Sequence, residues 1–266
     1  MNILTNFYKL FVYTFILSIV SSYSLAISSD WSVSETSKLR LISPYSQNDT
    51  KNLLIGLEYE MEPGWKTYWK SPGDGGFAQS ISWENSTNVQ NVNIQWPTPI
   101  EFEILGLTSL GYQNDVIFPL EIELEDESKN TFLNLHVNFL ICKEVCIPGD
   151  ATLFLEIPSG KKKLTDNYFN LEKALSLLPE EDFNSSYIKE INLKNFSDNQ
   201  NSTLQLEFKS DKVFYNPKIF LHSPFGLPVV KNSINYSSNN KKITTDFNFD
   251  KNLISEKKFP LEIIIK

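Results

Sequence analysis

The sequence is poor in the residues from which many catalytic sites are built. It holds two histidines and two cysteines in 266 residues. Neither His136 nor His222 stands beside an acidic or nucleophilic motif, so a hydrolytic triad has no support. The glycine-rich stretch Ser71-Pro-Gly-Asp-Gly-Gly76 lacks the Lys and Ser/Thr of a phosphate-binding loop, which indicates a turn. Basic charge is also scarce: a formal net charge of -8 argues against a nucleic-acid partner, which requires a basic face.

Long apolar runs are absent except at the N-terminus. There, Lys9 precedes an apolar stretch from Leu10 to Val20, and small residues follow up to Ala26. This layout predicts a signal peptide over residues 1–26, cleaved after about Ala26. An uncleaved membrane anchor is the alternative, although the run is shorter than the roughly 20 residues of a spanning helix. We therefore expect a soluble, exported protein in an oxidising compartment, where a disulfide persists.

Alternation with a period of two dominates residues 38–158. Apolar residues occupy the odd-numbered positions of 53–61, 133–141 and 151–157 and the even-numbered positions of 116–124, and most of the residues between them are polar. Strong turn chemistry separates these stretches, notably at Trp96-Pro-Thr-Pro99. Many short strands with no helix between them predict an antiparallel β-sandwich over residues 27–160.

Residues 161–186 have a different pattern. Tyr168, Leu171, Leu175 and Leu178 recur at helical spacing, and Thr165 or Asp166 is suited to cap a helix, so one amphipathic helix is expected in a linker. Beyond it, strands are expected near residues 188–196, 203–208, 217–221, 228–236, 242–249 and 260–265. Residues 187–266 are thus expected to form a second small β-sandwich domain that carries no chemical motif.

The only cysteines stand in Cys142-Lys-Glu-Val-Cys146-Ile-Pro148. The strand pattern places them at an accessible β-hairpin tip, with Cys142 on the more polar face and with Pro148 and Gly149 shaping the turn. Such a pair can exchange with partner thiols, because a second sulfur lies close enough to resolve a mixed disulfide. A purely structural disulfide is an alternative, although closing so short a loop contributes only roughly 2 kcal/mol.

Copper binding is the other alternative, because two thiolates hold Cu(I) well. Cys142 and Cys146 would be its ligands. A third ligand from His136 is out of reach, since six strand residues at about 3.3 Å each separate it from Cys142 by roughly 20 Å. His222 approaches only if the second domain folds back. No resident cofactor is expected.

An aromatic cluster precedes and enters the Ser71 to Gly76 turn. Core packing is one interpretation of these side chains, and a lid or partner contact that shields the disulfide from stray thiols is the other. Tyr112 is a further candidate for the same role. The cluster comprises Trp65, Tyr68, Trp69 and Phe77.

Four ordered motifs together resemble the periplasmic N-terminal domain of the DsbD family of thiol:disulfide interchange proteins, and most closely its ScsB-like branch, which is linked to copper tolerance. The resemblance spans roughly residues 38–158. The motifs are Gly64-Trp-Lys-Thr-Tyr-Trp-Lys-Ser-Pro-Gly-Asp74, Ile94-Gln-Trp-Pro-Thr-Pro99, Gly111-Tyr112 and Cys142-Lys-Glu-Val-Cys-Ile-Pro148.

The resemblance implies an immunoglobulin-like domain in the periplasm that takes reducing equivalents from a membrane-embedded partner and hands them to thioredoxin-fold proteins. Cytochrome c biogenesis is a process associated with such a relay. By likeness to the family, Cys146 forms the mixed disulfides and Cys142 resolves them, while Asp74 and Phe77 fall in the region of the family's protective cap loop. The gap between the cysteines is narrower here than in well-known family members.

The family commonly continues into a multi-span membrane domain and a thioredoxin-like domain, and neither follows here before Lys266. A separate membrane-embedded, DsbD-like electron donor is therefore expected. The whole chain is expected to be all-β, with two immunoglobulin-like antiparallel β-sandwich domains joined by a short helical linker.

Overall fold

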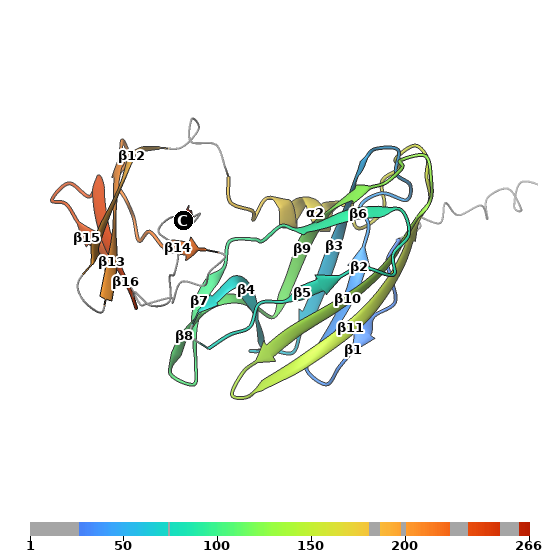
Figure 1. Cartoon of the computed structure of the whole chain (residues 1–266), viewed down its shortest axis with the longest axis horizontal. Helices are drawn as coiled ribbons and strands as arrows, with labels where there is room; N and C mark the ends of the chain where they lie inside the picture. Colours follow the sequence, from blue (N-terminus) through green and yellow to red (C-terminus); the bar gives the residue numbers. More distant parts are fainter. Residues whose placement is uncertain (1–26, 74, 181–186, 198–200, 224–233, 251–260) are drawn as a thin grey trace, which may run out of the picture.

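The computed structural model describes residues 27–73, 75–180, 187–197, 201–223, 234–250 and 261–266 (Figure 1). The expected signal peptide and Asp74 lie outside these ranges. Within them, no helix is both long enough and apolar enough to cross a membrane.

Two antiparallel sheets pack face to face and form what we call the N-terminal sandwich, strands β1 to β11. The first sheet has the order β1 (Ser32–Val33), β2 (Ser37–Ile42), β3 (Asn52–Met61), β9 (Asp115–Leu124) and β6 (Val89–Ile94). The second has the order β11 (Cys146–Ile157), β10 (Thr131–Cys142), β4 (Lys66–Gly73), β8 (Leu107–Gln113) and β7 (Ile100–Ile104), with β5 (Ser80–Ser82) pairing β10. The all-β, antiparallel fold class is confirmed.

The period-two pattern accounts for the core between these sheets. In β10 every odd-numbered residue from Thr131 to Ile141 is buried, while the even-numbered ones from Phe132 to Leu140 are exposed or half-buried. Strand β3 buries its odd positions from Leu53 to Met61 in the same way. Since successive strand side chains point to opposite faces, each strand places one apolar face in the core.

Strand β4 is held unusually close to β8. Gly111 of β8 lies opposite Tyr68 of β4, and a Cβ at Gly111 would stand 2.0 Å from the carbonyl oxygen of Thr67. No side chain fits that gap, so glycine permits the close approach of the two backbones. The position of Tyr68 is thereby tied to the centre of the second sheet.

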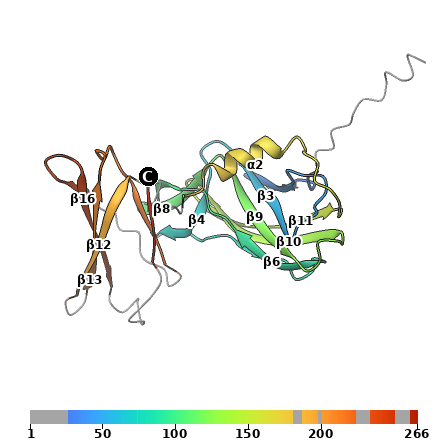
Figure 2. The ribbon, with the colours of Figure 1, turned by 90° about the horizontal axis from the view of Figure 1, so that it is seen from above.

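Helix α2 (Tyr168–Leu175) covers the outer face of the first sheet, above β3 and β9 (Figure 2). It buries Leu171 and Ala174. The predicted cap was wrong: the N-cap is Asn167, and its side chain makes no capping hydrogen bond. Thr165 instead donates its hydroxyl proton to the carbonyl oxygen of Ser43 at 2.6 Å, which fixes the linker to the sandwich.

The remaining strands form what we call the C-terminal module, strands β12 to β17. One sheet has the order β12 (Ile188–Ser197), β13 (Asn201–Ser210), β16 (Lys242–Asp250) and β15 (Ile234–Tyr236), and a separate pair consists of β14 (Ile219–His222) and β17 (Glu262–Ile265). All of these pairings are antiparallel. In Figure 1 the β14 strand lies between the four-stranded sheet and the N-terminal sandwich.

Candidate redox site

The two cysteines close the β10–β11 hairpin with a disulfide. Cys142 and Cys146 are register partners, with sulfurs 2.07 Å apart and Cα atoms 4.1 Å apart. The turn consists of residues 143–145, and the Lys143 N–H donates to the Val145 carbonyl oxygen at 3.0 Å. The disulfide therefore sits at the end of a regular two-stranded ladder.

The predicted role of Pro148 and Gly149 in this turn was wrong. Both lie within β11, where Pro148 pairs with Leu140 and Gly149 pairs with Phe139. A Cβ at Gly149 would stand 2.5 Å from the Phe139 ring, so the glycine there makes room for an aromatic side chain. Turn residues in the sequence can thus reflect packing within a strand.

The two sulfurs differ in exposure. Cys142 is fully buried, at 0% exposure, whereas Cys146 is half-buried and the turn residues 143–145 are exposed. Strand parity places Cys142 on the more polar face of β10, as expected, but that face is covered at this end of the strand. A partner approaching the hairpin tip therefore meets Cys146 before Cys142.

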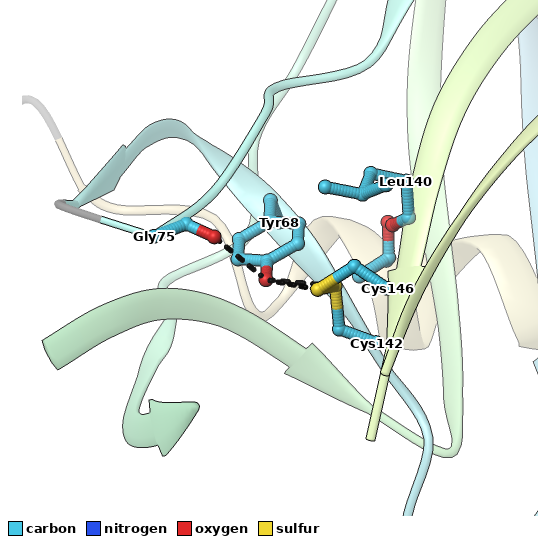
Figure 3. The surroundings of a disulfide bond; sticks show 6 residues. Tyr68, Gly75, Leu140, Cys142 and Cys146 are labelled. Carbon is cyan, nitrogen blue, oxygen red and sulfur yellow. Dashed lines mark hydrogen bonds between the residues drawn. A yellow bond between two sulfur atoms is a disulfide. The ribbon is translucent and has the colours of Figure 1, made fainter. Parts of the chain in front are cut away.

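Tyr68 lies against the disulfide. Its hydroxyl lies 3.0 Å from Cys142 Sγ and 3.8 Å from Cys146 Sγ, and also 3.2 Å from the carbonyl oxygen of Gly75 (Figure 3). Burial raises the pKa of Tyr68 above its ordinary value, so its phenol stays protonated at neutral pH. It can therefore donate a hydrogen bond toward sulfur or toward the Gly75 carbonyl oxygen.

The glycines that follow β4 allow the backbone to pass close to the Tyr68 ring. A Cβ at Gly76 would stand 2.3 Å from the Tyr68 ring, so only glycine lets the chain pass so close to it. Gly75 lies on the side of the Tyr68 hydroxyl away from the disulfide (Figure 3).

Three further side chains that were not predicted complete the apolar surroundings. Ile104 is buried with Tyr68 and Cys142, and Phe102 and Leu140 pack against that group. The Phe102 and Tyr68 ring centroids are 5.9 Å apart. Alternation in residues 100–104 signals a strand, but only the pairing of β7 with β8, and of β8 with β4, brings it to the cysteines.

The other aromatic candidates lie elsewhere. Trp69 is buried in the main core on the opposite face of β4 from Tyr68. Tyr112 is also in that core, where its hydroxyl donates to the Pro97 carbonyl oxygen at 2.6 Å and its ring packs edge-on against Phe118. Phe77 follows the glycines that pack on Tyr68 and is 55% exposed.

Neither histidine adds a third ligand beside the sulfurs in the described contacts. His136 Nδ1 lies 3.2 Å from Thr152 Oγ1, and His222 Nδ1 lies 2.6 Å from Ser71 Oγ. Across the part of the chain that the structure describes, no group of three or more His, Cys, Asp or Glu side chains could hold a metal ion.

Exposed apolar side chains stand at the tips of the two hairpins that bracket the site. Leu105 and Leu107 occupy the β7–β8 tip, and Val145 and Ile147 flank Cys146 at the β10–β11 tip; they are 75%, 42%, 58% and 40% exposed, respectively. Exposed apolar groups beside a functional group are typical of a protein contact surface.

Two comparisons with known proteins found similarity to this chain. Residues 38–158 match the family model described as "Thiol:disulfide interchange protein DsbD, N-terminal". The structure is similar to the crystal structure of the N-terminal periplasmic domain of ScsB from Proteus mirabilis, with a TM-score of 0.70 and 24% identity over 90% of this chain and 94% of that one. At this identity the likeness is one of fold. A search of curated proteins found no significant match.

Proposed function

Because residues 38–158 form a DsbD N-terminal-like domain, we propose that this chain exchanges disulfides with partner proteins through Cys142 and Cys146. The observation that carries the proposal is the asymmetry of the pair: Cys146 is half-buried at a hairpin tip, while Cys142 is fully buried under Tyr68. This asymmetry supports Cys146 as the cysteine that reacts with a partner and Cys142 as the one that resolves the product.

The proposed partners are a membrane-embedded electron donor and thioredoxin-fold acceptor proteins in the periplasm. Support comes from the family match and from the fold shared with a domain described as periplasmic. The apolar tips formed by Leu105, Leu107, Val145 and Ile147 supply a contact surface around Cys146. Such a surface suits brief encounters with several partners, because apolar contact is not directional.

The proposed transfer conserves atoms and electrons. In the reduced protein the Cys146 thiolate attacks a partner disulfide, forms a Cys146-to-partner disulfide and releases one partner thiolate. The Cys142 thiolate then attacks Cys146 Sγ, which releases the second partner thiolate and reforms the Cys142–Cys146 disulfide. Two electrons pass to the partner, whose two thiolates take protons from water.

Regeneration runs the same steps in reverse. A donor thiolate attacks Cys146 Sγ, and Cys142 leaves as a thiolate while the donor is held in a mixed disulfide; a second donor thiolate then attacks that disulfide and frees Cys146. Tyr68 donates its phenol hydrogen toward Cys142 Sγ, 3.0 Å away, and this stabilises the leaving thiolate. The raised pKa of Tyr68 keeps its phenol protonated throughout.

A transfer experiment tests the proposed function. The reduced protein is mixed with an oxidised thioredoxin-fold protein, and free thiols on each are counted by alkylation and mass spectrometry. We expect the acceptor to gain two thiols as the Cys142–Cys146 disulfide reforms, and the Cys142→Ser/Cys146→Ser control to give no transfer. Absence of transfer from the reduced wild type to any thioredoxin-fold protein tried would overturn the proposal.

A further inference from the structure

The β14–β17 pair carries buried apolar side chains on both of its faces. Phe220 pairs with Ile264, and Leu221 pairs with Ile263. Leu221 and Ile263 pack in the core of the C-terminal module, whereas Phe220 and Ile264 are buried in the core of the N-terminal sandwich. The pair is therefore shared between the cores of the two parts of the chain, and in Figure 1 its strand β14 lies between them.

Three consecutive residues of β4, Trp69 to Ser71, contact the β14–β17 pair. The Trp69 ring lies 6.4 Å from Phe220 and 6.0 Å from His222, centroid to centroid. Ser71 Oγ lies 2.6 Å from His222 Nδ1. Lys70 Nζ and Glu262 Oε2 form an ion pair at 2.5 Å. Apolar, hydrogen-bonding and ionic contacts thus all converge on residues 69–71.

Strand β4 also contains Tyr68, the residue that lies over the disulfide. Tyr68 immediately precedes Trp69 and points to the opposite face, because side chains alternate along a strand. Gly75, four residues beyond Ser71, has its carbonyl oxygen 3.2 Å from the Tyr68 hydroxyl. A displacement of residues 69–71 would therefore move Tyr68 and Gly75 together.

We propose that the C-terminal module is a positioning element for the redox site, because its β14–β17 pair holds β4 so that Tyr68 stays over the Cys142–Cys146 disulfide. The proposal rests on the proposed function, since it gives the module a part in thiol exchange. His222 and Glu262 are its positioning residues, and the disulfide is shielded while they stay docked on β4.

Docking weakens in acid. Burial lowers the pKa of His222, Lys70 on β4 lowers it further, and Glu262 on β17 opposes both. Because the docked His222 binds a proton less readily than the free side chain, docking is strongest above its ordinary pKa and is progressively lost as the pH falls below about 6.5. Shielding of the disulfide should follow the same direction.

The experiment measures the rate constant for reduction of the disulfide by dithiothreitol in the full chain. We expect His222→Ala to raise this rate about fivefold, because it removes roughly one partly buried hydrogen bond and a ring contact. His222→Asn keeps a polar group near the position of Nδ1 and should return most of the protection. His136→Ala, the matched control on β10, should leave the rate unchanged. The rate constant of the wild type, divided by that of His222→Asn, should increase as the pH is lowered from about 8 to about 5.

A charge exchange keeps the proposal testable if His222→Ala folds poorly. Lys70→Glu and Glu262→Lys alone each place like charges together and should raise the rate about threefold, whereas the double variant should return it to the wild-type value. Unchanged rates in His222→Ala and in both single charge variants, with normal transfer by wild type to a thioredoxin-fold protein, would overturn this inference alone. Altered small-thiol rates without any protein transfer would support the positioning role and overturn the proposed function instead.

Discussion

Cys142→Ser is expected to react with an aromatic disulfide reagent about 100-fold faster than Cys146→Ser. The first variant leaves Cys146, which is half-buried at the hairpin tip, and the second leaves Cys142, which has 0% exposure. A fully buried sulfur reacts only after local opening, and an opening free energy of about 3 kcal/mol corresponds to that factor. Release of the reagent's coloured thiolate, followed over time, measures both rates.

The Cys142→Ser/Cys146→Ser protein is the matched control and should release no thiolate. Each single variant is also denatured and assayed again, where the two should react at similar rates because burial no longer separates them. Equal rates in the native proteins, or a faster Cys146→Ser variant, would contradict the assignment of Cys146 as the exchanging sulfur and Cys142 as the resolving one.

Tyr68→Ala is expected to raise the rate of disulfide reduction by dithiothreitol by roughly 10- to 100-fold. The Tyr68 side chain is fully buried and its hydroxyl touches both sulfurs, so truncation opens a path to Cys142 as well as to Cys146. The loss of a large buried side chain should also lower the free energy of unfolding by about 3 kcal/mol. Rates are measured well below the unfolding midpoint, so that global unfolding does not contribute.

The Tyr68→Phe variant separates the shielding of the disulfide by the ring from the hydrogen bonds of the hydroxyl. The ring remains against Phe102, while the hydroxyl contacts to sulfur and to the Gly75 carbonyl oxygen are lost. We expect a rise of only about twofold to fivefold, the effect of roughly one net hydrogen bond. If Tyr68→Ala reduced no faster than Tyr68→Phe, the ring would not be the cover of the disulfide.

Local sequence patterns predicted the strands and the location of the cysteines, because both follow from short-range rules. The parity of residues 133–141 defined the buried face of β10, and the hairpin followed from the two apolar runs on either side of the pair. The burial of Cys142 could not be predicted in this way. It arises because Lys66 of β4 pairs beside it and brings Tyr68 with it, a contact across more than 70 residues.

The candidate shielding residues illustrate the same limit. Tyr68 and Trp69 are adjacent aromatics, and the sequence alone does not say which face of β4 meets the sulfurs. In the structure Tyr68, which pairs with Gly111 of β8, faces the sulfurs, and Trp69 packs on Phe220. Ile104 and Phe102 were missed because their strand reaches the site only through β8.

The C-terminal module shows what strand prediction leaves out. Strands near residues 217–221 and 260–265 were expected, and β14 and β17 lie there. Their pairing with each other, and their burial between two cores, depend on contacts between distant segments. The apolar run Ile263 to Ile265 is the one local signal, since a strand buried on both faces has no polar alternation.

The reduction potential of the Cys142–Cys146 pair tests the central claim most directly. The full chain is equilibrated in thiol buffers of graded potential, and the oxidised fraction is counted by alkylation. An exchanging pair is expected to titrate above about -300 mV, within reach of thioredoxin-fold partners. A potential well below about -300 mV would show a structural disulfide and contradict the proposed exchange.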